Sequence, residues 1–165
     1  MRPCASSRVP LCLQSRIAAA HLGRFRPLAD FDWSWPKRID RDALEESFRL
    51  DFISQAENLI LLGPNGVGKS MLAQNLCYQA ILHGIPALFT TASALLSDLT
   101  ERQTTHSLQH RLRHYARPKL LCIDEVGYLS YDARAADLLF VVITRRYQRV
   151  STIVTTNKPF TEWHE

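Results

Sequence analysis

Short apolar runs alternate with helical patterns along most of this chain. Four runs of largely apolar or β-branched residues, at 58–62, 87–90, 119–123 and 152–155, have the length and composition of buried strands. Apolar residues that recur at every third or fourth position predict helices at 40–50, 72–81, 93–103 and 134–149. Because the strands alternate with helices, the sequence predicts an α/β fold with a parallel sheet and helices on both faces.

The first 29 residues show neither pattern. They contain five arginines and no acidic residue. We therefore expect residues 1–29 to form a basic, poorly ordered N-terminal arm. Two other interpretations stay open: an Arg-rich, acid-free composition is also typical of an organellar transit peptide, and the stretch could be the remnant of a helical region.

Composition and charge narrow the class of protein. The 165 residues are 46% apolar and 22% charged, which fits one globular domain and neither a disordered nor a fibrous chain. The longest apolar run, 138–143, is far shorter than the roughly 20 residues of a membrane-spanning helix, so we expect no membrane contact. The net charge of +4 belongs to the arm, because residues 30–165 hold 15 basic and 16 acidic residues.

Four cysteines show no metal-binding spacing. Cys77 and Cys122 lie in apolar stretches and are expected to be buried thiols, while Cys4 and Cys12 lie in the arm. Unpaired thiols favour a reducing, cytoplasmic compartment.

An eight-residue segment after the first predicted strand carries the clearest chemistry. Residues 63–70 match the phosphate-binding pattern G-x-x-x-x-G-K-[ST] at every fixed position. Its glycines let backbone N–H groups converge on phosphate oxygens, and the next helix adds its N-terminal dipole. We expect Lys69 to reach the β- and γ-phosphates of ATP and the Ser70 hydroxyl to ligate Mg²⁺. The predicted cofactor-binding residues of this loop are Gly63, Pro64, Asn65, Gly66, Val67, Gly68, Lys69 and Ser70.

Two further strand ends point to the same crevice. The strand at 119–123 is followed by Asp124 and Glu125, and ligands bind at the carboxyl ends of strands in an open parallel sheet. We expect Asp124 to hold Mg²⁺ through its water shell and Glu125 to act as general base toward the attacking water. Asn157, after the last strand, could orient that water, although Asn-Lys-Pro is also ordinary turn chemistry. The catalytic candidates are Lys69, Glu125 and Asn157.

Several segments in one order resemble the IstB-type ATP-binding proteins, the transposition helpers of insertion sequences, which are similar to the DnaC helicase loader within the AAA+ class. These segments are 31–33 (FDW), 57–63 (ENLILLG), 123–129 (IDEVGYL), 146–147 (RY) and 151–163 (STIVTTNKPFTEW). The resemblance implies a P-loop NTPase of AAA+ type over residues 30–165. It implies an ATPase that self-associates, binds double-stranded DNA and assists a transposase. Lys69, Ser70, Asp124, Glu125 and Asn157 match the family's nucleotide and sensor positions. The connector at 31–36, where aromatic and polar residues alternate, is expected to be extended and to lie near the adenine.

The chain departs from this family pattern at its C-terminal end. Family members continue past the Glu-Trp pair into a region with a fifth core strand and the arginine finger used by a neighbouring subunit. The resemblance therefore implies an incomplete, C-terminally truncated domain, with an open apolar edge at 58–62 and very slow hydrolysis. Met71 stands where family members commonly carry His. The alternatives are a truncated, non-catalytic fragment and a DnaC-like helicase loader; a small-molecule kinase or a transporter ATPase would need features that the chain lacks.

A basic stretch at 101–119 is the candidate for DNA contact. This stretch holds one acidic residue and five basic ones: Arg102, Arg111, Arg113, Arg117 and Lys119. Such side chains neutralise phosphates whatever the base sequence, so the expected binding is non-specific and salt-sensitive. A DNA surface and a plain solvated face fit these residues equally, and the resemblance favours DNA. Histidines at 106, 110 and 114 follow one helical face, but no Cys or carboxylate completes a metal site.

Overall fold

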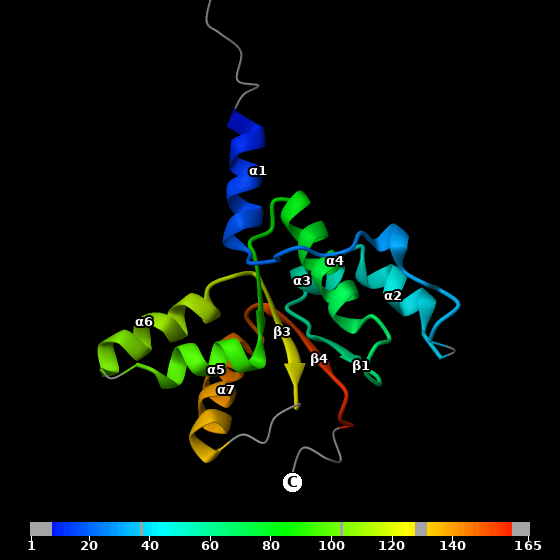
Figure 1. The fold of residues 1–165 in the computed structure, drawn as a ribbon. Coiled ribbons are helices and arrows are strands. Elements are labelled where there is room, and N and C mark those ends of the chain that lie inside the picture. The colour runs from blue at the N-terminus through cyan, green and yellow to red at the C-terminus, as the bar shows by residue number, and fades with distance from the viewer. Residues whose placement is uncertain (1–7, 37, 103, 128–131, 160–165) are drawn as a thin grey trace, which may run out of the picture.

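The fold is built on a four-stranded parallel sheet (Figure 1). The structure is a computed structural model that describes residues 8–36, 38–102, 104–127 and 132–159. Its strands are β1 (Leu59–Leu62), β2 (Ala87–Thr91), β3 (Leu120–Val126) and β4 (Ser151–Thr156), in the order β1-β4-β3-β2. All four predicted strands and their parallel pairing are confirmed, with β3 ending three residues later than expected.

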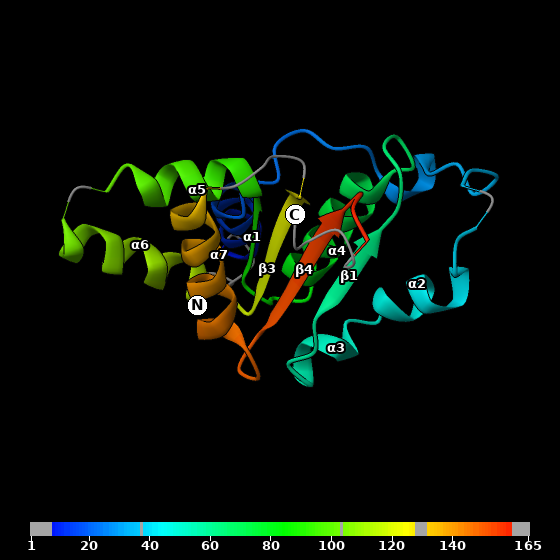
Figure 2. The ribbon, with the colours of Figure 1, turned by 90° about the horizontal axis from the view of Figure 1, so that it is seen from below.

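Helices cover both faces of the sheet because successive strand residues point to opposite sides. Leu120 and Cys122 pack with α4 (Lys69–Leu82) and α1 (Arg8–Ala19). Leu121 and Ile123 pack on the other face with α5 (Ala92–Thr100), α6 (Thr105–Ala116) and α7 (Ala133–Arg146). Figure 2 shows α2 (Arg41–Ser47) and α3 (Asp51–Ser54) beside β1, at the opposite edge of the sheet from α5 and α6.

The predicted helix at 40–50 ends at residue 47, and a second short helix begins at residue 51. Asp40 caps α2, accepting a hydrogen bond from Ala43 N at 3.0 Å. Leu50 then adopts a left-handed conformation, with φ of 67°, which ends the helical path before α3 begins. Leu50 is buried there, so packing holds a backbone geometry that its sequence does not favour.

The structure differs from the expectation of a poorly ordered arm over residues 8–29. Residues 8–19 form α1, and Leu13 and Ile17 pack against the α4 side of the core. Ala20 is fully buried, and its carbonyl accepts a hydrogen bond from Phe89 N at 2.8 Å. Apolar residues at 13, 17 and 20 have helical spacing, but only the surface of α4 shows that this face has a partner. Residues 1–7 lie outside the described part of the chain.

The strand β1 forms one open edge of the described sheet. It pairs only with β4 among the described strands. Its Ile60 and Leu62 side chains are 41% and 51% exposed, because the helices on that face do not reach them. The expected apolar edge is therefore confirmed. In the described segments, no helix has both the length and the apolar character that crossing a membrane requires.

Candidate nucleotide-binding site

The glycine-rich loop joins β1 to α4 at the carboxyl end of the sheet. Gly63 N donates to Thr156 O at 3.1 Å, which ties the start of the loop to the end of β4. Gly68 adopts a φ of 88°, and a Cβ atom there would lie 2.7 Å from the Phe31 ring. Only glycine fits this position, because any side chain would both strain the backbone and strike the ring.

Lys69 is the first residue of α4 and is buried against the loop. Its Nζ atom donates to Gly63 O at 2.7 Å and to Pro64 O at 2.8 Å. Burial lowers the pKa of the Lys69 ammonium, while the charges of Asp124 and Glu125 oppose that shift. The structure thus places one cation between the loop and two carboxylates.

Ser70 and Asp124 lie together although 54 positions separate them. The Ser70 Oγ atom donates to Asp124 Oδ1 at 3.0 Å, and Asp124 is 4% exposed. A hydroxyl and a carboxylate oxygen form a ligand set that suits Mg²⁺. A serine hydroxyl and an aspartate carboxylate at this distance therefore fit the Mg²⁺ site that the sequence predicted.

A bulge in β3 sets the positions of Asp124 and Glu125. Ile123 pairs with Val154 and Val126 pairs with Thr156, so the two acidic residues together oppose Thr155 alone. Glu125 adopts a φ of 62°, and its side chain is exposed while Asp124 is buried. Bulges of this kind redirect side chains beside functional sites. Here the bulge brings two consecutive carboxylates to the same end of the sheet.

Thr155 is a site residue that the sequence did not reveal. Its Oγ1 atom accepts a hydrogen bond from Glu125 N at 2.9 Å and donates one to Asp124 Oδ1. In the sequence Thr155 is one of several β-branched residues in a strand. The only signal was its position at the carboxyl end of that strand, opposite the acidic pair.

A hollow of about 440 Å³ opens over these groups. It is lined by residues of the loop and of both neighbouring strands: Asn65, Gly66, Gly68, Lys69, Ser70, Glu125 and Thr155. Asn157 is not among its lining residues, and the Asn157 Oδ1 atom is buried without a hydrogen-bond partner in the described structure. The structure therefore brings Lys69, Ser70, Asp124 and Glu125 together, while neither Asp124 nor Asn157 is among the residues that line the hollow.

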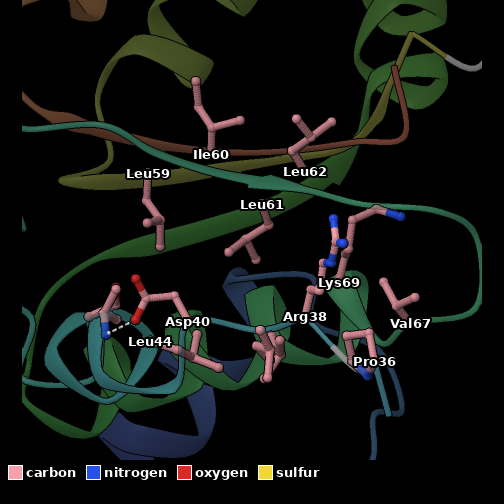
Figure 3. Close-up of a pocket in the computed structure, with 14 residues that line it drawn as sticks. Pro36, Arg38, Asp40, Leu44, Leu59, Ile60, Leu61, Leu62, Val67 and Lys69 are labelled. Carbon is pink, nitrogen blue, oxygen red and sulfur yellow. Dashed lines mark hydrogen bonds between the residues drawn. The ribbon is translucent and has the colours of Figure 1, made fainter. Parts of the chain in front are cut away.

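A second hollow of about 260 Å³ lies between β1 and α2 (Figure 3). Leu59 and Leu61 point into it, toward Leu44, whereas Ile60 and Leu62 point to the other face of the sheet. Lys69 lines both hollows. A mostly apolar hollow that adjoins the phosphate loop has suitable surroundings for a flat, weakly polar group.

The connector at 31–36 is not extended as expected. Trp35 N donates to Asp32 O at 3.1 Å, which closes a turn. Phe31 is buried against Leu44 and Leu72. Its ring packs edge-on against the Trp33 ring, with the two ring centroids 4.9 Å apart. Trp35 is 54% exposed. The buried Phe31 and Leu44 thus link the connector and α2 to the glycine-rich loop.

The basic stretch is divided by ion pairs. Arg111 contacts Asp98 at 2.5 Å, and Arg102 also pairs with Asp98. Among the candidate DNA-contact residues, Arg113, Arg117 and Lys119 are exposed. Two of the five predicted cations therefore have an internal partner in α5.

The histidines of α6 do not gather at a metal-sized site. Throughout the residues that the structure describes, no three His, Cys, Asp or Glu side chains converge on one point. Burial lowers the pKa of His114, with the Arg111 charge acting in the same direction. Cys77 and Cys122 are buried free thiols, as predicted.

Comparisons with known proteins identify the family of this chain. The model of the family described as IstB-like ATP binding protein matches residues 7–165. An insertion sequence IS5376 ATP-binding protein of Geobacillus stearothermophilus is 37% identical over 153 residues, which are 93% of this chain and 61% of that protein. The chain thus spans about three fifths of that relative's length.

Solved structures agree on the fold. The crystal structure of DnaI matches with a TM-score of 0.68 at 17% identity, over 90% of this chain and 77% of that chain. The crystal structure of the DnaC helicase loader matches with a TM-score of 0.60 at 22% identity, over 90% and 82%. The predicted AAA+ type of P-loop fold is therefore confirmed, in a chain that is short beside its relatives.

Proposed function

Since the chain belongs to the family of IstB-like ATP binding proteins, we propose that it binds ATP with Mg²⁺ and assists a transposase on double-stranded DNA. The observation that carries the nucleotide site is the Ser70–Asp124 hydrogen bond beside Lys69 at the mouth of the loop. The insertion-sequence relative supports the transposase and DNA parts. Self-association belongs to the same proposal.

Each site residue then has a role that its position supports. Lys69 exchanges the carbonyl oxygens of Gly63 and Pro64 for phosphate oxygens, which carry more negative charge. Ser70 and Asp124 hold Mg²⁺, which supplies positive charge at the phosphates when bound. We propose the hollow between β1 and α2 as the site of the adenine.

Hydrolysis needs a group that accepts a proton from water. Glu125 is exposed at the phosphate hollow and would accept a proton from the attacking water. We propose that the Asn157 amide orients that water; its Oδ1 atom is buried without a hydrogen-bond partner in the described structure.

Thermal unfolding with Mg-ATP tests the nucleotide site. Ligand that binds only the native state stabilises it, by about 2.7 kcal/mol at a concentration of 100 times Kd. We expect the midpoint to rise with Mg-ATP in the native sequence and to stay constant in Lys69→Ala. Arg134→Ala is the control, because Arg134 is an exposed cation of α7 that does not line the phosphate hollow. An equal rise in Lys69→Ala would contradict the proposed site.

A helicase-loader role is the second candidate, favoured by the fold match to the DnaC helicase loader. The two candidates differ in a direct pull-down: a helper of transposition retains the transposase encoded by the same insertion sequence, and a loader retains a replicative helicase.

A further inference from the structure

We infer that Thr155 is a positioning residue that fixes both acidic groups of the nucleotide site through one hydroxyl. The inference rests on the proposed binding of Mg-ATP. Thr155 is 1% exposed and lies at the carboxyl end of β4, facing the bulge of β3. It acts through Asp124 and Glu125.

The bulge creates the need for this hydroxyl. Two residues of β3 oppose one residue of β4, so the extra residue loses its place in the ladder of backbone hydrogen bonds. The N–H group of Glu125 instead donates to the Thr155 side chain at 2.9 Å. Because a buried N–H group without an acceptor is costly, this bond helps hold Glu125 at its φ of 62°.

The same hydroxyl has a defined orientation. A hydroxyl has one proton to donate, and Thr155 donates it to Asp124 Oδ1 while a lone pair accepts from Glu125 N. Ser70 donates to the same Asp124 oxygen at 3.0 Å. When Ser70 turns to a metal ion, Thr155 remains as the donor that holds the Asp124 carboxylate.

A purely structural role is the competing explanation, and the neighbouring residue separates the two. Thr156 is also 1% exposed and has the same side chain, yet its hydroxyl bonds only to the backbone of Lys158 among the described contacts. Thr156→Val therefore removes a buried threonine hydroxyl from the same strand without touching Asp124 or Glu125.

The test measures ATP affinity by calorimetry in Mg²⁺ and in EDTA for four chains. Outer-shell partners of metal ligands change metal affinity by about 10–100-fold. We expect Thr155→Val to weaken ATP binding about tenfold in Mg²⁺ and to leave binding in EDTA within about twofold. We expect Thr155→Ser, which keeps the hydroxyl, and Thr156→Val to behave as the native sequence in both media.

Each outcome has one meaning. Equal Mg²⁺ dependence in the native sequence and Thr155→Val overturns the inference, as does an equal loss in Thr156→Val. If the native sequence binds no Mg-ATP, the proposed function fails and the inference with it. If Thr155→Val does not fold, the comparison passes to Thr155→Ser and Thr155→Ala. If ATP binding by Thr155→Ala then keeps the Mg²⁺ dependence of the native sequence, the inference is overturned. If only Thr155→Ser keeps it, the inference is supported.

Discussion

Arg146 carries a charge that the fold buries almost completely, with 1% of the residue exposed. Its guanidinium donates to the Tyr115 and Pro118 carbonyls at 2.9 Å and to the Ser151 carbonyl at 2.5 Å. In the described chain, no carboxylate pairs with it. Burial lowers the pKa of Arg146 to about 10, so the group stays charged near neutral pH. One side chain thus joins the end of α6, the start of β3 and the start of β4.

Replacing Arg146 tests this connection at the scale of one residue. Arg146→Met fills a similar volume but leaves the carbonyls of Tyr115, Pro118 and Ser151 without this donor. We expect the free energy of unfolding in urea to fall by about 3 kcal/mol, the usual cost of buried polar groups left unsatisfied. Arg145→Met is the control, since Arg145 lies beside it and bonds to the Gln109 side chain. A loss below about 1 kcal/mol in Arg146→Met would show that the network adds little.

Within the site, the geometry of single residues could not be predicted from the sequence. The pattern at 63–70 and the acidic pair after β3 predicted the grouping of Lys69, Ser70 and Asp124, because a strand–loop–helix frame places them at one end of the sheet. The bulge could not be predicted, since a one-residue shift of pairing depends on the packed neighbours. For the same reason Thr155 was missed, and the role of Asn157 in orienting water stays a prediction.

At the scale of elements, one carboxylate holds α5 against α6. Asp98 accepts hydrogen bonds from Arg111 at 2.6 Å and Tyr115 at 2.9 Å, and it also pairs with Arg102. Burial opposes ionisation of Asp98, but these donors outweigh it and hold its pKa below the usual value. Burial and the bond to Asp98 raise the pKa of Tyr115 to about 12. Arg102 and Arg111, two of the cations predicted to contact DNA, thus pair with Asp98 and help hold α5 against α6.

The pH dependence of stability tests this helix pair. A carboxyl whose pKa is lower in the folded state stabilises the fold above its unfolded pKa of about 3.9, and the effect is lost as pH falls through the folded value. We expect Asp98→Asn to cost about 1–2 kcal/mol at pH 7, discounted for partial solvent access, and the gap to the native sequence to close in acid. Asp137→Asn, at an exposed position of α7, should show no such gap. A gap independent of pH would contradict the role of the Asp98 charge.

The elements themselves were largely predictable. Each β strand was visible as an apolar run and α4 as a repeat of apolar positions, since those segments are buried by the sheet. The helix α1 was not predicted, because its few apolar residues acquire meaning only against α4. The break at Leu50 was hidden for a similar reason: packing, and no local preference, holds its positive φ.

At the scale of the whole molecule, exposed cations lie in more than one region. The apolar edge of β1 lies at one end of the sheet and α5 and α6 at the other (Figure 2). The exposed cations include two groups that could contact DNA: Arg113, Arg117 and Lys119 at and after the end of α6, and Arg16, Arg24 and Arg26 in the N-terminal segment. The net charge of +4 does not show which of these two groups contacts DNA. Only a measurement that counts cations at each region can assign the proposed DNA contact.

The salt dependence of DNA binding provides that count. Each phosphate neutralised contributes a slope of about −0.9 to log K against log salt concentration for double-stranded DNA. If the exposed cations Arg113, Arg117 and Lys119 contact DNA, replacing all three with Ser should weaken binding and flatten the slope by about 2.7. Replacing Arg16, Arg24 and Arg26 removes equal charge from the other region and should leave the slope nearly unchanged. The reverse result would move the proposed DNA surface to the N-terminal segment, because local contacts set the slope and total charge does not.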